Sequence, residues 1–217
     1  MSIYLQKHER YGYSMIKNII FDMGGVLINF DRDLFIRRLG VSDEDAALLK
    51  KHVFLSIEWA MLDRGTLSDA QAAGIMSRKV PERLQEKVKE LVLKWDEPLI
   101  EIEGMYDLIK ELADSGYNIY LLSNASFRQH EYWPRISSSR FFKDTLISSD
   151  VKLVKPQTEI YNLACRKFGI EASESVFIDD SIANAEGAVF AGMKGIVFHD
   201  PADLRAELIK LGVSISA

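Results

Sequence analysis

Asp22 follows an apolar run that begins at residue 16 and precedes two glycines, in residues 21–26 (FDMGGV). Such a run is typical of a buried parallel strand, and a carboxylate at its carboxyl end lies where open α/β sheets bind ligands. Gly24 and Gly25 allow backbone amides to approach an anion closely. Asp22 is therefore a candidate nucleophile, metal ligand or both, although a glycine turn capped by an aspartate would have the same residues.

Other polar side chains occur where further strands are expected to end or a helix to begin. They are Ser123 and Asn124 after the run 118–122, Lys155 before Pro156, and Asp179 and Asp180 after the run 175–178. Taken singly, these groups also suit a helix cap, a solvated lysine and the start of a loop. Because the carboxyl ends of parallel strands meet at one edge of a sheet, we expect them to gather beside Asp22.

The residue types of such a cluster restrict the reactions that it could catalyse. Three carboxylates repel one another unless a cation neutralises them, and all-oxygen ligands favour magnesium. The metal and Lys155 would offset the charge of a phosphate, so that Asp22 could attack phosphorus, while Ser123 and backbone amides hold the other phosphoryl oxygens. The expected product is an aspartyl-phosphate that water hydrolyses in a second step.

The elements that must position these groups alternate along most of the chain. Strand patterns at 16–21, 118–122, 145–147, 175–178 and 195–198 are interleaved with helical patterns at 104–115, 159–168, 182–191 and 202–211. This alternation predicts an α/β fold with a Rossmann-like, doubly wound parallel sheet. Residues 33–95 show no strand pattern.

The strandless segment has helix-start signals instead. Ser42 with Asp45 and Ser68 with Gln71 have the spacing of N-caps, and Pro81 suits a first helical position. We expect three to five short helices that form an inserted, all-helical cap. The predicted organisation is a catalytic core at 15–31 and 97–217, a cap at 32–96, and a loosely ordered N-terminal extension at 1–14.

Composition restricts the class of protein. The chain has 217 residues and a net charge of −5, which argues against a nucleic-acid partner. Its one cysteine, Cys165, excludes an internal disulfide. No apolar run approaches membrane-spanning length, and residues 1–14 lack the apolar region of a signal peptide. We expect a cytoplasmic protein that acts on a small molecule; the sequence does not decide between monomer and dimer.

The four motifs together resemble those of the haloacid dehalogenase (HAD) superfamily of hydrolases, over residues 16–211. They are FDMGGV at 21–26, LLSN at 121–124, KP at 155–156 and IDDS at 178–181 with Asn184. The resemblance implies a Rossmann-like core, a helical cap and a magnesium ion. It implies that the ion is held by Asp22, the Gly24 carbonyl and Asp180, with Asp179 bound directly or through water.

By the same resemblance, the substrate would be a small phosphorylated metabolite. The catalytic residues would be Asp22 as nucleophile, Ser123 and Lys155, and the substrate would be bound by Gly24, Gly25, Ser123, Asn124 and Lys155. Within the superfamily the chain is most similar to the subgroup with the pattern Asp-x-Gly-x-Val, which includes bacterial phosphatases for α-D-glucose 1-phosphate. We therefore expect a sugar phosphate as substrate.

Gly24 departs from the pattern of the superfamily's phosphatases. The resemblance implies an Asp at this position, which would act as general acid and then as general base. A positioned acid or base contributes about 10²–10⁴-fold to a rate. Either the enzyme favours leaving groups that need no proton, such as anomeric, acyl or aryl ones, or another group supplies the proton. That group would be a water, or a polar side chain from residues 29–32 or from the cap.

Gly24 also leaves two other functions open. One is a 2-haloacid dehalogenase, in which Asp22 attacks carbon without a metal, and the other is a catalytically quiet protein that binds phosphometabolites or a protein partner. Substrate selection is expected to come from the cap, where the candidate contacts are Glu58, Trp59, Asp63 and Arg64. Trp133 is a further candidate, as an apolar wall or as packing.

Overall fold

A parallel sheet lies at the centre of the molecule. The computed structural model describes residues 15–215, so the extension expected at 1–14 lies outside the described residues. The five strands are β1 (Asn18–Phe21), β2 (Asn118–Ser123), β3 (Asp144–Ile147), β4 (Ser175–Asp179) and β5 (Lys194–Val197). All pairs are parallel, in the order β3-β2-β1-β4-β5. The α/β fold with a parallel sheet is therefore confirmed, and β1 begins at Asn18 rather than at residue 16.

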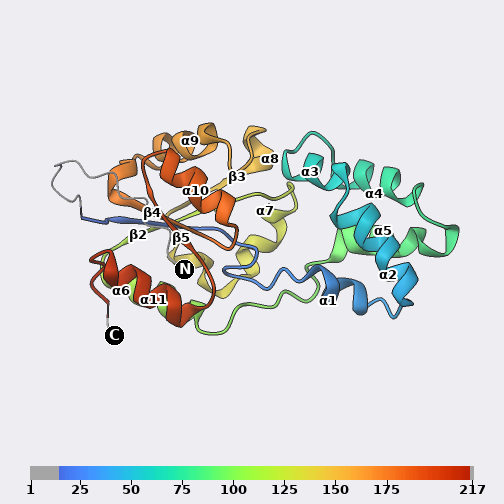
Figure 1. Ribbon diagram of the computed structural model, residues 1–217, viewed down its shortest axis with the longest axis horizontal. Helices are drawn as coiled ribbons and strands as arrows, with labels where there is room; N and C mark the ends of the chain where they lie inside the picture. The colour runs from blue at the N-terminus through green and yellow to red at the C-terminus, as the bar shows by residue number, and fades with distance from the viewer. Residues whose placement is uncertain (1–14, 216–217) are drawn as a thin grey trace.

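Successive strand residues face opposite sides of the sheet, and each side is covered by helices. Ile19 and Phe21 belong to one apolar cluster, and Ile20 belongs to another. Helices α6 (Met105–Asp114) and α11 (Pro201–Lys210) cover the first side, and α9 (Thr158–Phe168) and α10 (Ile182–Phe190) cover the second (Figure 1). This two-sided burial explains why the strands are continuous apolar runs.

Short helical segments complete the connections of the core. They are α7 (Gln129–Tyr132), α8 (Ser148–Val151) and the 3-10 helices at Trp133–Arg135, Ser137–Phe141 and Ala172–Glu174. None of the helices in the described part of the chain is long and apolar enough to cross a membrane.

Residues 32–94 are helical and lie to one side of the sheet (Figure 1). The α-helices are α1 (Arg32–Arg37), α2 (Asp43–Leu49), α3 (Ile57–Asp63), α4 (Asp69–Ser77) and α5 (Gln85–Lys94), with a π-helix at Lys50–Phe54 and a 3-10 helix at Glu82–Leu84. These helices enclose an apolar cluster of their own, in which Phe35, Leu49 and Met76 are buried. We call residues 32–96 the cap, and its exact boundaries stay a prediction.

Side-chain caps fix where the cap helices begin. The Ser42 hydroxyl accepts a hydrogen bond from the amide of Asp45, and Ser68 and Gln71 form a reciprocal capping box. Both N-caps were predicted from the sequence. The prediction for Pro81 is wrong in detail: Pro81 precedes a 3-10 turn, and the α-helix begins four residues later at Gln85.

Two antiparallel segments connect the cap to the core. The amide of Asn29 donates to the carbonyl of Ile100 at 2.7 Å, and the amide of Ile102 donates to the carbonyl of Leu27 at 2.9 Å. The outgoing and returning chains therefore support each other directly after the Asp22 loop.

A buried ion pair links the segment after α5 to the core. Asp96 is 1 % exposed, and its carboxylate accepts a hydrogen bond from Arg128 at 2.7 Å and another from Arg135. Arg128 also donates to the carbonyl of Val92 near the end of α5. Removing one partner of a buried pair leaves the other charge uncompensated, which is strongly destabilising.

We therefore expect Asp96→Ala to lower the free energy of unfolding by about 3 kcal/mol, measured by urea denaturation. The matched control is Asp114→Ala, which removes an exposed i,i+4 pair with Lys110 and should cost less than about 1 kcal/mol. Equal losses in the two variants would show that the Asp96 pair does not fasten the cap segment to the core.

Candidate active site

Asp22 lies directly after the central strand β1, between the ends of β2 and β4. Its amide donates to the carbonyl of Ile178 at 2.8 Å, which continues the sheet pattern to this residue. Its carboxylate is 2.8 Å from the ammonium of Lys155, which in turn is 2.7 Å from Asp179. The side chains of Lys155 and Asp179 are fully buried. The structure thus brings Asp22, Lys155 and Asp179 into contact, as the sequence predicts.

Asp179 is held by donors on both carboxylate oxygens. Besides Lys155, the amide of Ser181 donates at 2.9 Å, and the side-chain amide of Asn184 donates at 3.0 and 3.1 Å. With four hydrogen bonds to its two oxygens, this carboxylate is fixed in place and orients Lys155. The resemblance did not give Asn184 a role, and the structure places it here.

Asn124 fixes the backbone of Lys155. Its side-chain oxygen accepts a hydrogen bond from the Lys155 amide at 2.9 Å, and its side-chain nitrogen donates to the Lys155 carbonyl at 3.0 Å. The Lys155 ammonium also donates to the carbonyl of Leu122 at 3.1 Å. The residues after β2 therefore position the lysine even though it comes from a distant part of the sequence.

Burial and neighbouring charges have opposite effects on the pKa values of Asp22 and Lys155. Burial raises the pKa of the Asp22 carboxyl to about 8; Lys155 lowers this pKa, and the carboxylate of Asp179 raises it further. Burial lowers the pKa of the Lys155 ammonium, but Asp22 and Asp179 outweigh burial and raise it above its ordinary value. An additional cation would favour the ionised form of Asp22.

The carboxylates of Asp22, Asp179 and Asp180 fit a divalent ion. One oxygen from each lies within 4.8 Å of the others, and an all-oxygen set suits magnesium. Asp180 is exposed to solvent, while Asp22 and Asp179 are buried. The donor set therefore agrees with the metal expected from the sequence.

Gly25 allows Asp180 to approach the Asp22 loop. Its φ is +76°, and a Cβ there would lie 2.3 Å from a carboxylate oxygen of Asp180. At Gly24 a Cβ would meet only Phe30, at 3.5 Å. The two glycines thus differ in kind: a side chain at position 25 would collide with a candidate metal ligand, whereas a methyl group at position 24 has room.

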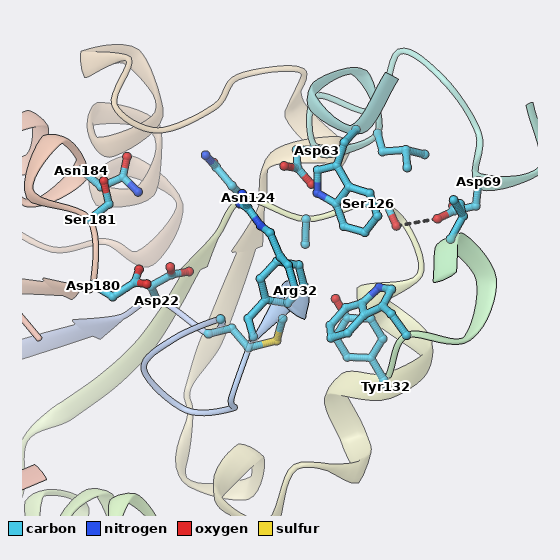
Figure 2. Close-up of a pocket in the computed structure, with 18 residues that line it drawn as sticks. Asp22, Arg32, Asp63, Asp69, Asn124, Ser126, Tyr132, Asp180, Ser181 and Asn184 are labelled. Atoms are coloured by element: carbon cyan, nitrogen blue, oxygen red, sulfur yellow. Dashed lines mark hydrogen bonds between the residues drawn. The ribbon is translucent and has the colours of Figure 1, made fainter. Parts of the chain in front are cut away.

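A cavity of about 300 Å³ opens between the core and the cap (Figure 2). Of the sequence-predicted site residues, Asp22, Gly24, Asn124 and Asp180 line it. Ser123, Lys155 and Asp179 do not line it, because they are buried beneath its surface.

Of the contacts predicted for the cap, likewise, only some line the cavity. Trp59 and Asp63 line the cavity. Glu58 instead turns to Lys79, whose ammonium lies 2.7 Å from both carboxylate oxygens, and Arg64 is exposed elsewhere. Trp133 packs edge-on against Phe142, with ring centroids 5.0 Å apart, and does not reach the cavity.

Sequence reasoning missed most of the wall opposite Asp22. The missed aromatic residues are Phe30, Trp95 and Tyr132, and the missed polar residues are Asp69 and Ser126. Ser181, which belongs to the IDDS motif, lines the cavity on the side of Asp22 and Asp180 (Figure 2). Arg32 lies in the segment 29–32 that was considered as a source of a polar group. Ser126 follows Asn124 by two residues, which was an available signal, whereas nothing in the sequence marks Tyr132. Figure 2 shows Asp22 and Asp180 at one side of the cavity and Asp69, bonded to Ser126, at the other.

Several known proteins are similar to this chain. The D-ribitol-5-phosphate phosphatase of Bacteroides thetaiotaomicron is 28 % identical over 207 residues, covering 89 % of this chain and 97 % of the phosphatase. The crystal structure of the HAD family enzyme BT-2542 from the same organism matches with a TM-score of 0.69 at 23 % identity, covering 89 % of this chain and 98 % of that one. That enzyme has also been crystallised with magnesium and inorganic phosphate (TM-score 0.64, 25 % identity, 87 % and 98 % covered).

The L-2-haloacid dehalogenase of Xanthobacter autotrophicus shares the fold, with a TM-score of 0.63 at 16 % identity over 90 % of this chain and 83 % of that one. The family model for haloacid dehalogenase-like hydrolases matches residues 16–192. This match spans most of the chain and includes all the residues of the carboxylate–lysine cluster described above. The protein therefore belongs to the haloacid dehalogenase-like hydrolases.

Proposed function

We propose that this protein is a magnesium-dependent phosphatase of small phosphorylated metabolites, with Asp22 as its nucleophile. The observation that carries the proposal is the contact of Asp22 with a buried lysine, beside two further carboxylates and at the edge of a small cavity. A carboxylate that only closes a turn has no need of this arrangement. Perturbed, mutually coupled ionisable groups in a cleft are typical of active sites.

In the proposed reaction an oxygen of Asp22 forms a bond with phosphorus, and the ester bond to the leaving group breaks. Lys155 holds positive charge beside the attacking carboxylate and so reduces its repulsion from the phosphate. Magnesium, when bound, supplies further positive charge to the same oxygens. Water then attacks the phosphorus of the aspartyl-phosphate, which releases phosphate and restores Asp22.

We assign the metal to Asp22, Asp180 and the Gly24 carbonyl. Asp179 contributes directly or through water, and its four hydrogen bonds favour the indirect role. Ser123 is 1 % exposed, so its proposed contact with the phosphoryl group requires that group to sit deep at the end of β2. Asn124 supports the proposed phosphate site by fixing Lys155. The phosphate contact predicted for Gly25 does not come from its amide, because that amide donates to the carbonyl of Ile28 at 2.8 Å.

The cavity favours a polyol or sugar phosphate as substrate. Its volume of about 300 Å³ is at the lower end for ligand sites. Trp59, Trp95 and Tyr132 offer apolar faces, and Arg32, Asp69 and Ser126 offer hydrogen-bonding groups. The similarity to a ribitol-phosphate phosphatase supports this substrate class, and the Asp-x-Gly-x-Val pattern adds α-D-glucose 1-phosphate as a specific candidate.

The two alternative functions, a dehalogenase and a binding protein without catalysis, account for fewer features of the site. A dehalogenase needs no metal, so three gathered carboxylates would have no purpose in it. A protein that only binds phosphometabolites needs neither the Asp22 nucleophile nor its contact with Lys155.

Phosphate release from a panel of sugar, polyol and aryl phosphates tests the proposal. We expect release that requires magnesium, is abolished by EDTA and falls on the order of 10³-fold or more in Asp22→Asn, because the nucleophile is lost. Release that persists in Asp22→Asn or in EDTA would contradict the proposed chemistry. Activity on 2-haloacids without phosphate release would establish the dehalogenase instead.

A pair of glycine variants tests the proposed metal site. Gly25→Ala should displace Asp180 and weaken magnesium binding by about 10–100-fold in calorimetric titration, the loss typical of a disturbed ligand set. Gly40→Ala is the matched control, because Gly40 also has a positive φ, of +62°, but a Cβ there would meet nothing within 4 Å, and its affinity should stay close to that of the wild type. Unchanged affinity in Gly25→Ala would exclude Asp180 from the metal site.

A further inference from the structure

Gly24, at the position of the missing acid, has no side chain that could donate a proton. The side chain nearest to this position is Phe30, because a Cβ at Gly24 would lie 3.5 Å from Cβ and 3.6 Å from Cγ of that residue. Phe30 is itself held among Phe35, Trp59 and Trp95, with its ring centroid 5.0 Å from that of Trp95. A proton donor at this site must therefore come from another part of the cavity wall.

Asp63 is a carboxylate on the cap side of the same cavity, at the end of α3. Its backbone carbonyl accepts a hydrogen bond from the hydroxyl of Ser148 at 2.5 Å, and that hydroxyl accepts from the amide of Ala125 at 2.9 Å. Ala125 directly follows Asn124, which holds Lys155. The cap residue is thus tied to the loop that positions the catalytic lysine.

The rest of the segment 63–69 is fastened to the core as well. The Gly65 carbonyl accepts a hydrogen bond from Lys152, and a Cβ at Gly65 would lie 2.3 Å from the carbonyl oxygen of Ser149. The Asp69 carboxylate accepts from Ser126 at 2.8 Å. These contacts hold Asp63 in the cavity wall opposite Asp22 (Figure 2).

The carboxylate of Asp63 is free, in contrast to those of the other acids of the cavity. Asp22 is paired with Lys155, Asp69 is bonded to Ser126, and Asp180 belongs to the proposed metal site. Within residues 15–215 no hydrogen bond or ion pair holds the Asp63 carboxylate, although Arg32 lies in the same wall. A free carboxyl group in a cavity is able to contact the substrate.

The surroundings of Asp63 suit a group that both gives and takes a proton. Burial raises the pKa of its carboxyl to about 7; Arg32 and Lys155 lower this pKa, and Asp69 raises it. Tyr132, which also lines the cavity, stays neutral because burial raises its pKa well above the ordinary value. An acid–base catalyst works best when its pKa lies near the operating pH.

We propose that Asp63, contributed by the cap, is the general acid and base of this enzyme, in place of the acid that Gly24 lacks. The proposal rests on the proposed phosphatase function. As Asp22 bonds to phosphorus and the ester bond breaks, the leaving oxygen takes the proton of the Asp63 carboxyl and departs as an alcohol. The Asp63 carboxylate then takes a proton from the water whose oxygen attacks phosphorus. The bond from phosphorus to Asp22 breaks, which releases phosphate and restores Asp22 as a carboxylate and Asp63 as a carboxylic acid.

This assignment makes the reaction depend on the basicity of the leaving group. The proton is essential for an alkoxide, helpful for a phenolate and dispensable for a nitrophenolate. The enzyme should therefore hydrolyse simple alkyl phosphates, which decides between the two consequences of Gly24 that the sequence left open.

The test compares Asp63→Asn with the wild type on D-ribitol 5-phosphate, phenyl phosphate and p-nitrophenyl phosphate. We expect kcat/KM to fall about 10²–10⁴-fold for the alkyl ester, less for phenyl phosphate, and little for p-nitrophenyl phosphate. Because kcat/KM reports only the steps through alcohol release, loss of the base in the second step does not disturb the comparison. That loss should appear instead as a burst of nitrophenolate in Asp63→Asn.

Glu58→Gln is the matched control. Glu58 lies on the same helix as Asp63 but is turned to Lys79, outside the cavity lining. Its variant should leave the ratio of the kcat/KM values for the three esters unchanged. Retained activity of Asp63→Asn on p-nitrophenyl phosphate shows that the variant is folded and that the Asp22 chemistry is intact.

The pH dependence of the wild type is a second readout that needs no variant. Only the protonated Asp63 gives a proton, so the ratio of kcat/KM for the alkyl ester to that for p-nitrophenyl phosphate should fall as the pH rises through about 7. Ionisation of Asp22 affects both esters and cancels in this ratio. The two esters form their dianions at different pH, because the nitrophenyl group lowers the second pKa of its phosphate, so each kcat/KM value is expressed per concentration of the dianion.

Equal losses on all three esters in Asp63→Asn, or a pH-independent ratio, would overturn the proposal. So would a wild type that hydrolyses aryl but no alkyl phosphates. A higher KM for ribitol phosphate alone, with unchanged kcat and no difference between the two aryl esters, would make Asp63 a substrate-binding group. The failure of the phosphatase proposal itself looks different, because then no ester would be hydrolysed through Asp22.

Discussion

A buried lysine held between two carboxylates is the constraint on which the rest of the structure depends. Lys155 contacts Asp22 and Asp179 at 2.8 and 2.7 Å, and its side chain has no exposed surface. A buried charge is tolerated only with close partners and further hydrogen bonds, and the carbonyl of Leu122 supplies one. The parallel sheet meets this need because the ends of β1, β2 and β4 are adjacent, although their residues are far apart in the sequence.

The cap is constrained by the same site. Its segment 63–69 is hydrogen-bonded to the loops after β2 and β3, and Asp96 ties its returning end to Arg128. Its aromatic cluster continues through Trp95 to Tyr132 of the core, with ring centroids 5.2 Å apart. The cavity is thus walled by side chains that are fixed from both sides, which suits recognition of a small substrate.

The sheet and the carboxylate–lysine cluster could be predicted because their signals are local. Apolar runs that end in Asp22, Ser123 and Asp179 predict both the strand and the position of the polar group at its end. Parallel pairing of the strands brings these polar groups together. The cavity wall has no such signal. Tyr132 and Asp69 face the cavity only because separate helices dock against the core, and Glu58 resembles Asp63 in sequence but is turned to Lys79. The error at Pro81 has a local cause, since a 3-10 turn precedes α5 there.

Formation of a phosphoryl bond on Asp22 is the central claim of this account, and rapid acid quenching during turnover with magnesium tests it most directly. Mass spectrometry of the tryptic peptide 18–32, which contains Asp22, should reveal the added mass of a phosphoryl group on that residue. The modification should be absent without magnesium and in Asp22→Asn. Turnover without any phosphoryl group on this peptide, or with the group on another residue, would contradict the assignment of Asp22 as nucleophile.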